Sequence, residues 1–264
     1  MEKRVLNSVN YTWRLVATGI SFIIFGVGGI FLTLIVFPVV SLFVRCSVRR
    51  KLVVRKVIQL TFRLFLEMVS FFGIFAFDLT GAKNELSNYS GKIIVANHPS
   101  LIDIVALIAL LPNADCIVKR ELWSNPFLRG VVSTAGYIKN SENIEQLFNA
   151  CESSLQSGSS LIIFPEGTRT KTDGRINMQR GASNIALKCE KDLVPVTIRC
   201  NPTTLTKNEP WYRIPKEKAN FSLSVGGIIE VEAFNEKHQS RSIGARKLTK
   251  YIEAYFTEEL RNYA

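Results

Sequence analysis

The hydrophobic and polar positions of the chain follow two patterns, which meet near residue 80. Residues 15–44 contain no charged side chain, an uncharged run of 30 residues. Such a run exceeds the ~20 residues that an α-helix needs to cross a bilayer. It is also too long for the apolar core of a signal peptide. We expect either one tilted or kinked helix or a helical hairpin that dips into one leaflet.

A second apolar stretch, residues 57–77, contains only two charged side chains, Arg63 and Glu67. We interpret this stretch as an interfacial or membrane-dipping helix. The alternative is a buried core helix of the domain that follows. Together the two stretches predict an N-terminal, membrane-embedded helical region over residues 1–80.

After residue 80, short apolar runs alternate with longer segments of helical periodicity. Strands are expected at residues 92–96, 116–119, 137–139, 161–164 and 194–199, and a strand-rich stretch at 221–234. Helices are expected at residues 100–111, 125–134, 178–189 and 242–260, and between a cap at Ser141 and a stop at Gly158. This alternation predicts an α/β domain over residues 81–264, with a mostly parallel sheet flanked by helices.

Charge and cysteine usage narrow the choice of partners. The net charge is +11, and residues 1–80 carry ten Lys or Arg against three Asp or Glu. Positive charge beside apolar sequence favours an anionic membrane surface, and no nucleic-acid signature is found, so we expect no nucleic-acid partner. The basic stretch at residues 45–56 predicts a cytoplasmic position, although the other flank is basic too. Five cysteines without a CxxC pair and only two histidines argue against a zinc site.

One of the two histidines lies where a predicted strand turns into a helix, in the sequence Asn97–His98–Pro99. Proline is favoured at the first helical position, so Asn97 or His98 would cap the helix and Asp103 would lie in its second turn. Because His98 precedes the helix, its imidazole is free to fold back toward Asp103. A carboxylate on one ring nitrogen would leave the other nitrogen to accept a proton. The alternative is that both side chains only satisfy donors at the helix end.

The sequence "IIFPEGTRT", residues 162–170, follows another predicted strand. Gly167 permits close backbone approach, Thr168 offers a hydroxyl and an amide, and Arg169 offers a planar fork suited to phosphate. If the two strands are parallel, both motifs emerge at the same carboxyl edge of the sheet, where α/β proteins bind ligands. We therefore expect one shared cleft; the alternative is a surface salt bridge between Glu166 and Arg169 in a turn.

The pair "NHPSLID" and "FPEGTRT" resembles the lysophospholipid acyltransferase family, which includes the glycerophosphate and 1-acylglycerol-3-phosphate acyltransferases. The first motif of that family is N-H-x4-D and its third is F-P-E-G-T-R. The resemblance extends over about residues 80–235, where "VKRELW" with "PFLRGVVSTAGYI" looks like the second block and "LVPVTIR" like the fourth. The two main motifs together are highly specific.

The resemblance implies a membrane-bound O-acyltransferase of phospholipid biosynthesis, similar to bacterial relatives at the inner membrane with a cytoplasmic catalytic domain. It would move a fatty acyl chain from acyl-CoA or acyl carrier protein to the hydroxyl of a lysophospholipid such as 1-acylglycerol-3-phosphate. His98 would be the general base and Asp103 its partner, with no acyl-enzyme intermediate and no further cofactor or metal. Membrane lipids and the acyl donor would be its partners.

By the same resemblance, Glu166, Gly167 and Arg169 would bind the phosphate of the acceptor or order the site, and Asn97 with the backbone amides near it would help to stabilise the oxyanion. The full set of expected substrate-binding residues is Asn97, Lys119, Lys139, Glu166, Gly167, Thr168 and Arg169. One departure concerns the second block, where many members carry an arginine that grips the acceptor phosphate and this chain carries Asn140. Lys139 would then substitute as a point charge, or the acceptor differs.

Three alternatives stay open. The acceptor could be another amphiphile, such as an aryl-polyene lipid precursor; the protein could bind lipid without catalysis; or it could hydrolyse the thioester. Two further features lie outside these motifs. The second histidine, His238, is expected to be a solvated loop residue, and "EPWYRIP", residues 209–215, is either an interfacial loop or a structural turn.

Overall fold

The centre of the protein is one seven-stranded sheet. A computed structural model describes residues 2–170, 175–235 and 240–261. The strands are β1 Phe75–Asp78, β2 Ile93–Ala96, β3 Ala114–Val118, β4 Ile138–Lys139, β5 Ser160–Ile163, β6 Leu193–Asn201 and β7 Ala219–Val225. Their order is β1-β7-β6-β2-β5-β3-β4, and every neighbouring pair is parallel except β6 with β7. The predicted mostly parallel sheet is therefore confirmed.

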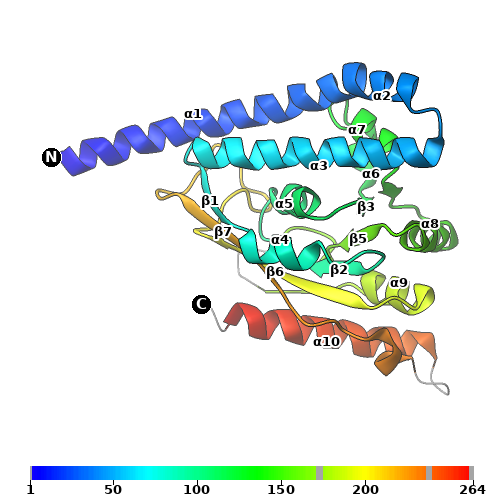
Figure 1. The fold of residues 1–264 in the computed structure, drawn as a ribbon. Coiled ribbons are helices and arrows are strands. Elements are labelled where there is room, and N and C mark those ends of the chain that lie inside the picture. The colour runs from blue at the N-terminus through cyan, green and yellow to red at the C-terminus, as the bar shows by residue number, and fades with distance from the viewer. Residues whose placement is uncertain (1, 171–174, 236–239, 262–264) are drawn as a thin grey trace.

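Helices cover both faces of this sheet (Figure 1). They are α1 Glu2–Phe31, α2 Phe37–Phe43, α3 Ser47–Phe71, α4 Thr80–Leu86, α5 Asp103–Leu110, α6 Arg120–Ser124, α7 Arg129–Thr134, α8 Ile144–Gln156, α9 Gly181–Cys189 and α10 Arg241–Arg261. A π-helical segment, Leu32–Val36, joins α1 to α2, so that the chain forms one long rod before α3 runs back beneath it. The rod, α3 and α5 lie on one side of the sheet, and α9 and α10 lie on the other.

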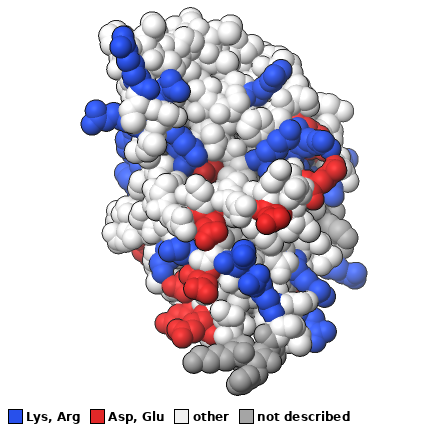
Figure 2. Space-filling model, turned by 90° about the vertical axis from the view of Figure 1, so that its right-hand side faces the viewer, with Lys and Arg blue, Asp and Glu red and all other residues white. Residues whose placement is uncertain are grey.

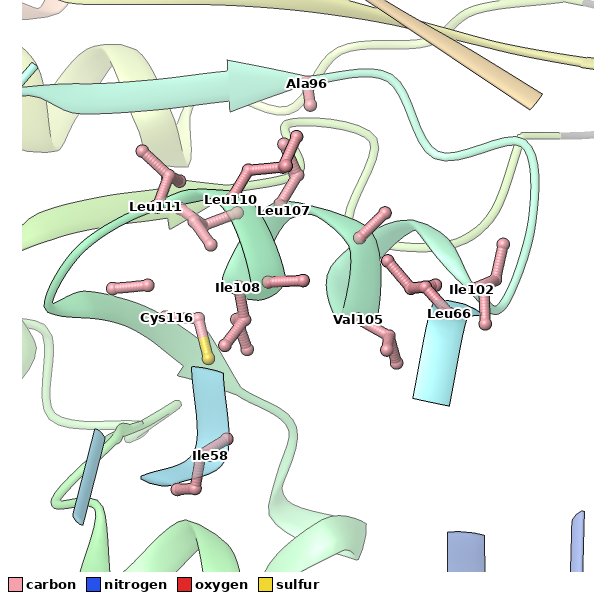
Figure 3. Close-up of a cluster of buried hydrophobic side chains, with 14 of the residues drawn as sticks. Ile58, Leu66, Ala96, Ile102, Val105, Leu107, Ile108, Leu110, Leu111 and Cys116 are labelled. Atoms are coloured by element: carbon pink, nitrogen blue, oxygen red, sulfur yellow. The ribbon is translucent and has the colours of Figure 1, made fainter. Parts of the chain in front are cut away.

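Helix α5 lies between α3 and the sheet, and it is apolar on nearly all sides for that reason. Six of its eight residues are buried hydrophobics, and they pack with Ile58 and Leu66 of α3 and with Cys116 of β3 (Figure 3). Burial of a single aliphatic side chain contributes about 1.5–3 kcal/mol, so this layer fixes the start of α5 firmly in the fold. Asp103 is the first residue of that helix.

Helix α1 has a docked face of small and polar residues and an outer apolar face. Arg14, Ala17, Thr18 and Ser21 are buried against the rest of the molecule. The exposed hydrophobic side chains follow a helical spacing of three and four residues: Val9, Trp13, Val16, Ile20, Ile23, Val27 and Phe31. Residues 8–43 form one helix that is long and apolar enough to cross a membrane, judged by length and composition.

A buried ion pair attaches α3 to the sheet. The guanidinium of Arg55 contacts the carboxylate of Asp115 on β3 and also donates to the Ser159 hydroxyl at 2.9 Å. Both members of the pair are buried, and Ser154 adds a hydrogen bond of 2.6 Å to the same carboxylate. The opposite face of α3 is exposed, with Leu64 and Phe71 among its outer side chains. Helix α3 thus combines the core helix and the exposed apolar helix that the sequence left as alternatives.

The observed elements correct several predicted boundaries. Residues 221–234 are not continuously strand-rich, because β7 ends at Val225 before two glycines and a short 3₁₀ helix follows at Val231–Phe234. Helix α8 is capped by Asn143, whose side chain accepts from two backbone N–H groups, and not by Ser141. The division at residue 80 separates β1 from the rest of the sheet, because β1 pairs with β7.

Candidate active site

The histidine and aspartate of the first motif lie in direct contact. His98 follows β2, and its Nδ1 lies 2.8 Å from Oδ2 of Asp103. The same carboxylate oxygen accepts the backbone N–H of Ser100, also at 2.8 Å. The sequence placed Asp103 in the second turn of a helix beginning at Pro99, but α5 begins at Asp103 itself. The longer loop before α5 is what allows the imidazole to fold back on the carboxylate.

Burial changes the pKa of the Asp103 carboxyl group. The Asp103 side chain is fully buried, whereas His98 retains 16% of its side-chain exposure. Desolvation raises the pKa of Asp103 from 3.8 to about 6, against the opposing effects of the His98 and Ser100 hydrogen bonds. Asp103 therefore changes its charge close to neutral pH. Because Nδ1 of His98 is held, Nε2 is the ring nitrogen left to meet a substrate.

The second motif surrounds His98 from the neighbouring strand. Phe164 follows β5, which pairs with β2, and its ring stacks on the imidazole with centroids 4.1 Å apart and planes at 19°. Oε1 of Glu166 accepts the backbone N–H of His98 at 2.9 Å. The backbone N–H of Thr170 donates to the carbonyl of His98 at 2.7 Å. The ring and both backbone polar groups of His98 are therefore held by this loop.

Glu166 has a positioning role in this arrangement. The carboxylate is buried, and its Oε1 also accepts the Thr170 hydroxyl at 2.7 Å. Desolvation raises its pKa above the ordinary value, opposed by the hydrogen bonds from Thr170 and His98. Of the two expected roles, phosphate binding and ordering of the site, these contacts support the second. Gly167 lies at the loop surface with φ +66°, a conformation suited to glycine, and Thr168 beside it is half-buried.

Arg169 links the second motif to a segment that the sequence did not single out. Its Nη1 donates to the carbonyls of Leu205 and Thr206 at 2.7 and 2.8 Å. The Leu205 carbonyl also accepts the backbone N–H of Leu101 at 3.2 Å. The segment after β6 thus joins the two motif loops. No sequence signal marked it, because the contacts run through main-chain carbonyls; phosphate binding by Arg169 stays a prediction.

Asn97 faces the sheet. Its Nδ2 donates to the carbonyl of Ile198 at 2.8 Å, and its Oδ1 accepts the Ile198 N–H at 2.7 Å. The side chain is buried and continues the pairing of β2 with β6 beyond the end of β2. This placement argues against the predicted oxyanion role of the Asn97 side chain, since its amide is occupied by the backbone of β6.

The two lysines lie farther along the sheet edge. Lys119 follows β3 and Lys139 ends β4, and both are exposed. Strands β5 and β3 separate β4 from β2, so Lys139 is not brought to His98. Lys139 instead lies 5.9 Å from the ring centroid of Trp123. It lines a polar cavity of about 460 Å³ with Arg120 and Asn140, and neither motif loop contributes to its lining.

A second cavity is apolar and lies between the N-terminal helices. It has a volume of about 350 Å³ and is lined by residues of α1, α3 and α7 and of the π-helical segment. Its surface is almost entirely hydrocarbon, with Phe25, Phe62 and Phe65 among the lining side chains. Among the described residues, no group of three or more His, Cys, Asp or Glu side chains could hold a metal ion. His238 lies outside the described residues.

Comparison with known proteins agrees with this geometry. Residues 79–199 match the family model described as Acyltransferase. The 1-acyl-sn-glycerol-3-phosphate acyltransferase of Helicobacter pylori is 35% identical over 131 residues, which cover 46% of this chain and 55% of that protein. The chloroplastic 1-acyl-sn-glycerol-3-phosphate acyltransferase LPAT1 of Arabidopsis thaliana is 30% identical over 135 residues, 49% of this chain and 38% of that protein. The chain thus spans about half the length of these curated relatives, or less.

The fold is also that of a solved structure. The crystal structure of the 1-acyl-sn-glycerophosphate acyltransferase PlsC from Thermotoga maritima superimposes with a TM-score of 0.68. The match covers 95% of this chain and 97% of that one at 19% sequence identity. Residues 79–199 of the chain are thus similar to the acyltransferase family, and the relatives that share this region are named 1-acyl-sn-glycerol-3-phosphate acyltransferases.

Proposed function

We propose that the protein transfers a fatty acyl chain from an acyl thioester to the hydroxyl of a lysophospholipid such as 1-acylglycerol-3-phosphate. The observation that carries the proposal is the His98–Asp103 pair, with Nδ1 and Oδ2 2.8 Å apart and the ring held by the second motif. A neutral imidazole fixed in this way through Nδ1 is a general base whose other ring nitrogen, Nε2, is left to accept a proton. The names of the matching relatives support the same reaction class.

The reaction proceeds in one addition and one elimination. The acceptor hydroxyl donates its proton to Nε2 of His98 while its oxygen attacks the thioester carbonyl carbon. Asp103 stabilises the imidazolium that forms. Collapse of the tetrahedral intermediate breaks the carbon–sulfur bond, and the imidazolium returns its proton to the leaving thiolate. The products are the ester and the free thiol of coenzyme A or of an acyl carrier protein, and His98 is restored.

The phosphate of the acceptor requires an electropositive partner near His98. Arg169 lies on the loop that also holds His98, and its Nη1 is fixed by two carbonyls, so its guanidinium is already oriented. Thr168 supplies a backbone N–H and a hydroxyl on the same loop, and Gly167, whose own N–H donates to the Phe164 carbonyl at 3.0 Å, permits close approach of the phosphate to the backbone. Lys119, one strand further along the edge, adds positive charge.

The placement of Lys139 favours a second candidate acceptor. Asn140 stands where many family members carry an arginine, and Lys139 lies in the separate polar cavity. An amphiphile without a terminal phosphate, such as an aryl-polyene lipid precursor, would not need that arginine. The reaction class and the role of His98 are the same for both acceptors.

We further propose that the protein lies at the inner membrane, with the catalytic domain on the cytoplasmic side. The exposed stripe of α1 is apolar, while its opposite face is docked on the domain. Figure 2 views the end of the molecule where α2 turns into α3, and its uncharged upper part is bordered by Lys and Arg. Helix α3 begins with Arg49, Arg50 and Lys51 in its first turns, and such positive charge beside an apolar surface is attracted by anionic headgroups.

An assay of the full-length protein in detergent tests the proposed reaction. Acyl-CoA and acyl carrier protein would each be offered with lysophosphatidic acid, other lysolipids and a phosphate-free amphiphile. Formation of a diacyl product supports the proposal and identifies donor and acceptor. Release of free fatty acid without ester product would favour a hydrolase, and lipid binding without turnover would favour a non-catalytic protein.

A further inference from the structure

The connection between β6 and β7 presents an aromatic tip to the outside of the molecule. We call residues 207–215, "KNEPWYRIP", the aromatic loop. Trp211 and Tyr212 are 45% and 57% exposed, and their ring centroids lie 5.8 Å apart. Two large exposed aromatic side chains at one loop tip indicate a contact surface.

The aromatic loop packs directly against α1. The ring of Trp211 lies over Gly19, where an added Cβ would be 3.2 Å from the nearest indole carbon. The ring centroids of Trp211 and Phe22 are 6.0 Å apart. Below them, the guanidinium of Arg14 donates to the carbonyl of Lys216. The loop and the helix therefore form one continuous surface.

This surface continues the exposed apolar stripe of α1. Ile20 and Ile23 flank the glycine that Trp211 covers, and both are exposed. Tryptophan and tyrosine have an apolar ring with a polar edge and are enriched at the headgroup level of membranes. Residues 207–218 also carry four Lys or Arg against two Glu, an excess that anionic headgroups attract.

We propose that the aromatic loop is a second membrane-contact element, inserted into the headgroup layer of the same leaflet that α1 enters. The proposal rests on the membrane association included in the proposed function. Its occupant is the lipid surface, because the loop extends an apolar helix face and is rimmed by positive charge. A protein partner is the competing outcome of the test below.

The same connection also contacts both motif loops of the candidate active site. The Ser100 hydroxyl donates to the carbonyl of Thr204 at 2.9 Å, and Leu101 and Arg169 both donate to the carbonyl of Leu205. A loop fixed in the headgroup layer would hold these residues beside the leaflet. An amphiphilic acceptor could then reach His98 without leaving the membrane entirely.

Tryptophan fluorescence tests the proposal, because the chain has only three tryptophans, Trp13, Trp123 and Trp211. Single-tryptophan forms of the full-length protein would be mixed with phosphatidylethanolamine–phosphatidylglycerol vesicles that contain brominated lipid. We expect emission from Trp211 to shift to the blue, to be quenched by the bromines and to be protected from iodide. If the Trp13 form shows that α1 is bound while Trp211 stays accessible to iodide and unquenched, the loop does not contact the membrane.

Charge reversal supplies an independent readout. Arg213→Glu in the aromatic loop should weaken vesicle partitioning about fivefold to thirtyfold. The matched variant Lys250→Glu lies on α10, on the other side of the sheet, and should leave partitioning unchanged. Equal effects of the two variants would overturn the proposal. Neither measurement requires turnover, so a failure here is distinct from a failure of the proposed acyl transfer.

Discussion

The carboxylate of Glu166 accepts the backbone N–H of His98 at 2.9 Å and so joins the loops that follow two neighbouring strands, β5 and β2. Thr170 completes the contact by donating to the His98 carbonyl at 2.7 Å. A motif that the sequence suggested for phosphate binding therefore also fixes the backbone of the proposed base. Catalysis depends on such positioning, because small displacements of a reacting group lower the rate strongly.

The Glu166 contact predicts a kinetic signature. Glu166→Ala should lower kcat by about 10²-fold, since His98 loses one backbone anchor, while KM for the acceptor changes little. Glu166→Gln keeps an oxygen acceptor and should retain more activity than Glu166→Ala. The check is steady-state kinetics with varied acceptor. A rise in KM at unchanged kcat would assign Glu166 to substrate binding instead.

The raised pKa of Asp103 predicts an acid limb in the pH–rate profile. The carboxylate must be ionised to stabilise the imidazolium, and its pKa of about 6 means that this form is lost as pH falls through that value. We expect acyl transfer to decline below about pH 6. Asp103→Asn should lower the rate about 10³–10⁴-fold and remove this limb, as measured by kcat from pH 5 to 8. A limb that persists in the variant would assign the titration to another group.

The same shift has a consequence for stability. Because burial raises the folded pKa of Asp103 above its unfolded value of 3.8, folding favours the protonated form. Its contribution is fully present below pH 3.8 and is lost as pH rises through about 6. Asp103→Asn, which carries no charge, should therefore keep or raise the thermal midpoint at pH 8 although it lowers the rate of acyl transfer strongly. A large fall of the midpoint at pH 8 would contradict this sign.

Two adjacent glycines of α1 offer a matched pair of substitutions. An added Cβ at Gly29 would lie 2.6 Å from the carbonyl oxygen of Phe127, whereas at Gly28 no atom lies within 4 Å. Gly29→Ala should therefore separate α1 from the loop before α7 and lower the thermal midpoint in detergent. Gly28→Ala should be neutral or stabilising, by up to about 1 kcal/mol from helix propensity. Equal effects of both variants would contradict this docking of α1.

The free energy of unfolding should depend strongly on Arg55, which pairs with Asp115. The sequence marked Arg55 only as part of the basic stretch at residues 45–56. Arg55→Met leaves a buried carboxylate without its partner and should cost about 3–5 kcal/mol of unfolding free energy. Lys51→Met is the control, because Lys51 is 3.8 Å from the same carboxylate but 40% exposed, and should cost less than about 1 kcal/mol. Denaturant unfolding of the purified protein measures both. Similar costs would show that the pair does not attach α3.

The sequence predicted the parts of the fold that local pattern determines. Strands β2 and β5 are short buried runs, and both were expected to within one residue, since continuous apolar sequence between turn signals specifies them. Strand β1 was missed because its apolar residues continue the hydrophobic run of α3. The sequence marked Arg55 only as part of the basic stretch at residues 45–56, because its partner, Asp115, is 60 residues away in the chain.

Some contacts of the candidate site could likewise be predicted from local sequence, whereas others depend on the tertiary fold. The contact of His98 with Asp103 followed from a spacing of five residues at a helix start, so local sequence sufficed. The clamp by Phe164 and Thr170 lies within a recognised motif, but only the pairing of β5 with β2 brings these residues to His98. The link from Arg169 to Leu205 uses a main-chain carbonyl, which leaves no signal in residue type.

The central claim is that His98 is the general base of acyl transfer, and one comparison tests it most directly. His98→Ala would be assayed beside His238→Ala, which changes the only other histidine of the chain, with the acyl donor and acceptor that the wild-type protein uses. We predict that His98→Ala loses acyl transfer by at least about 10²-fold, while it still folds and binds acceptor, and that His238→Ala keeps wild-type activity. Acyl transfer by His98→Ala at the wild-type rate would contradict the assignment.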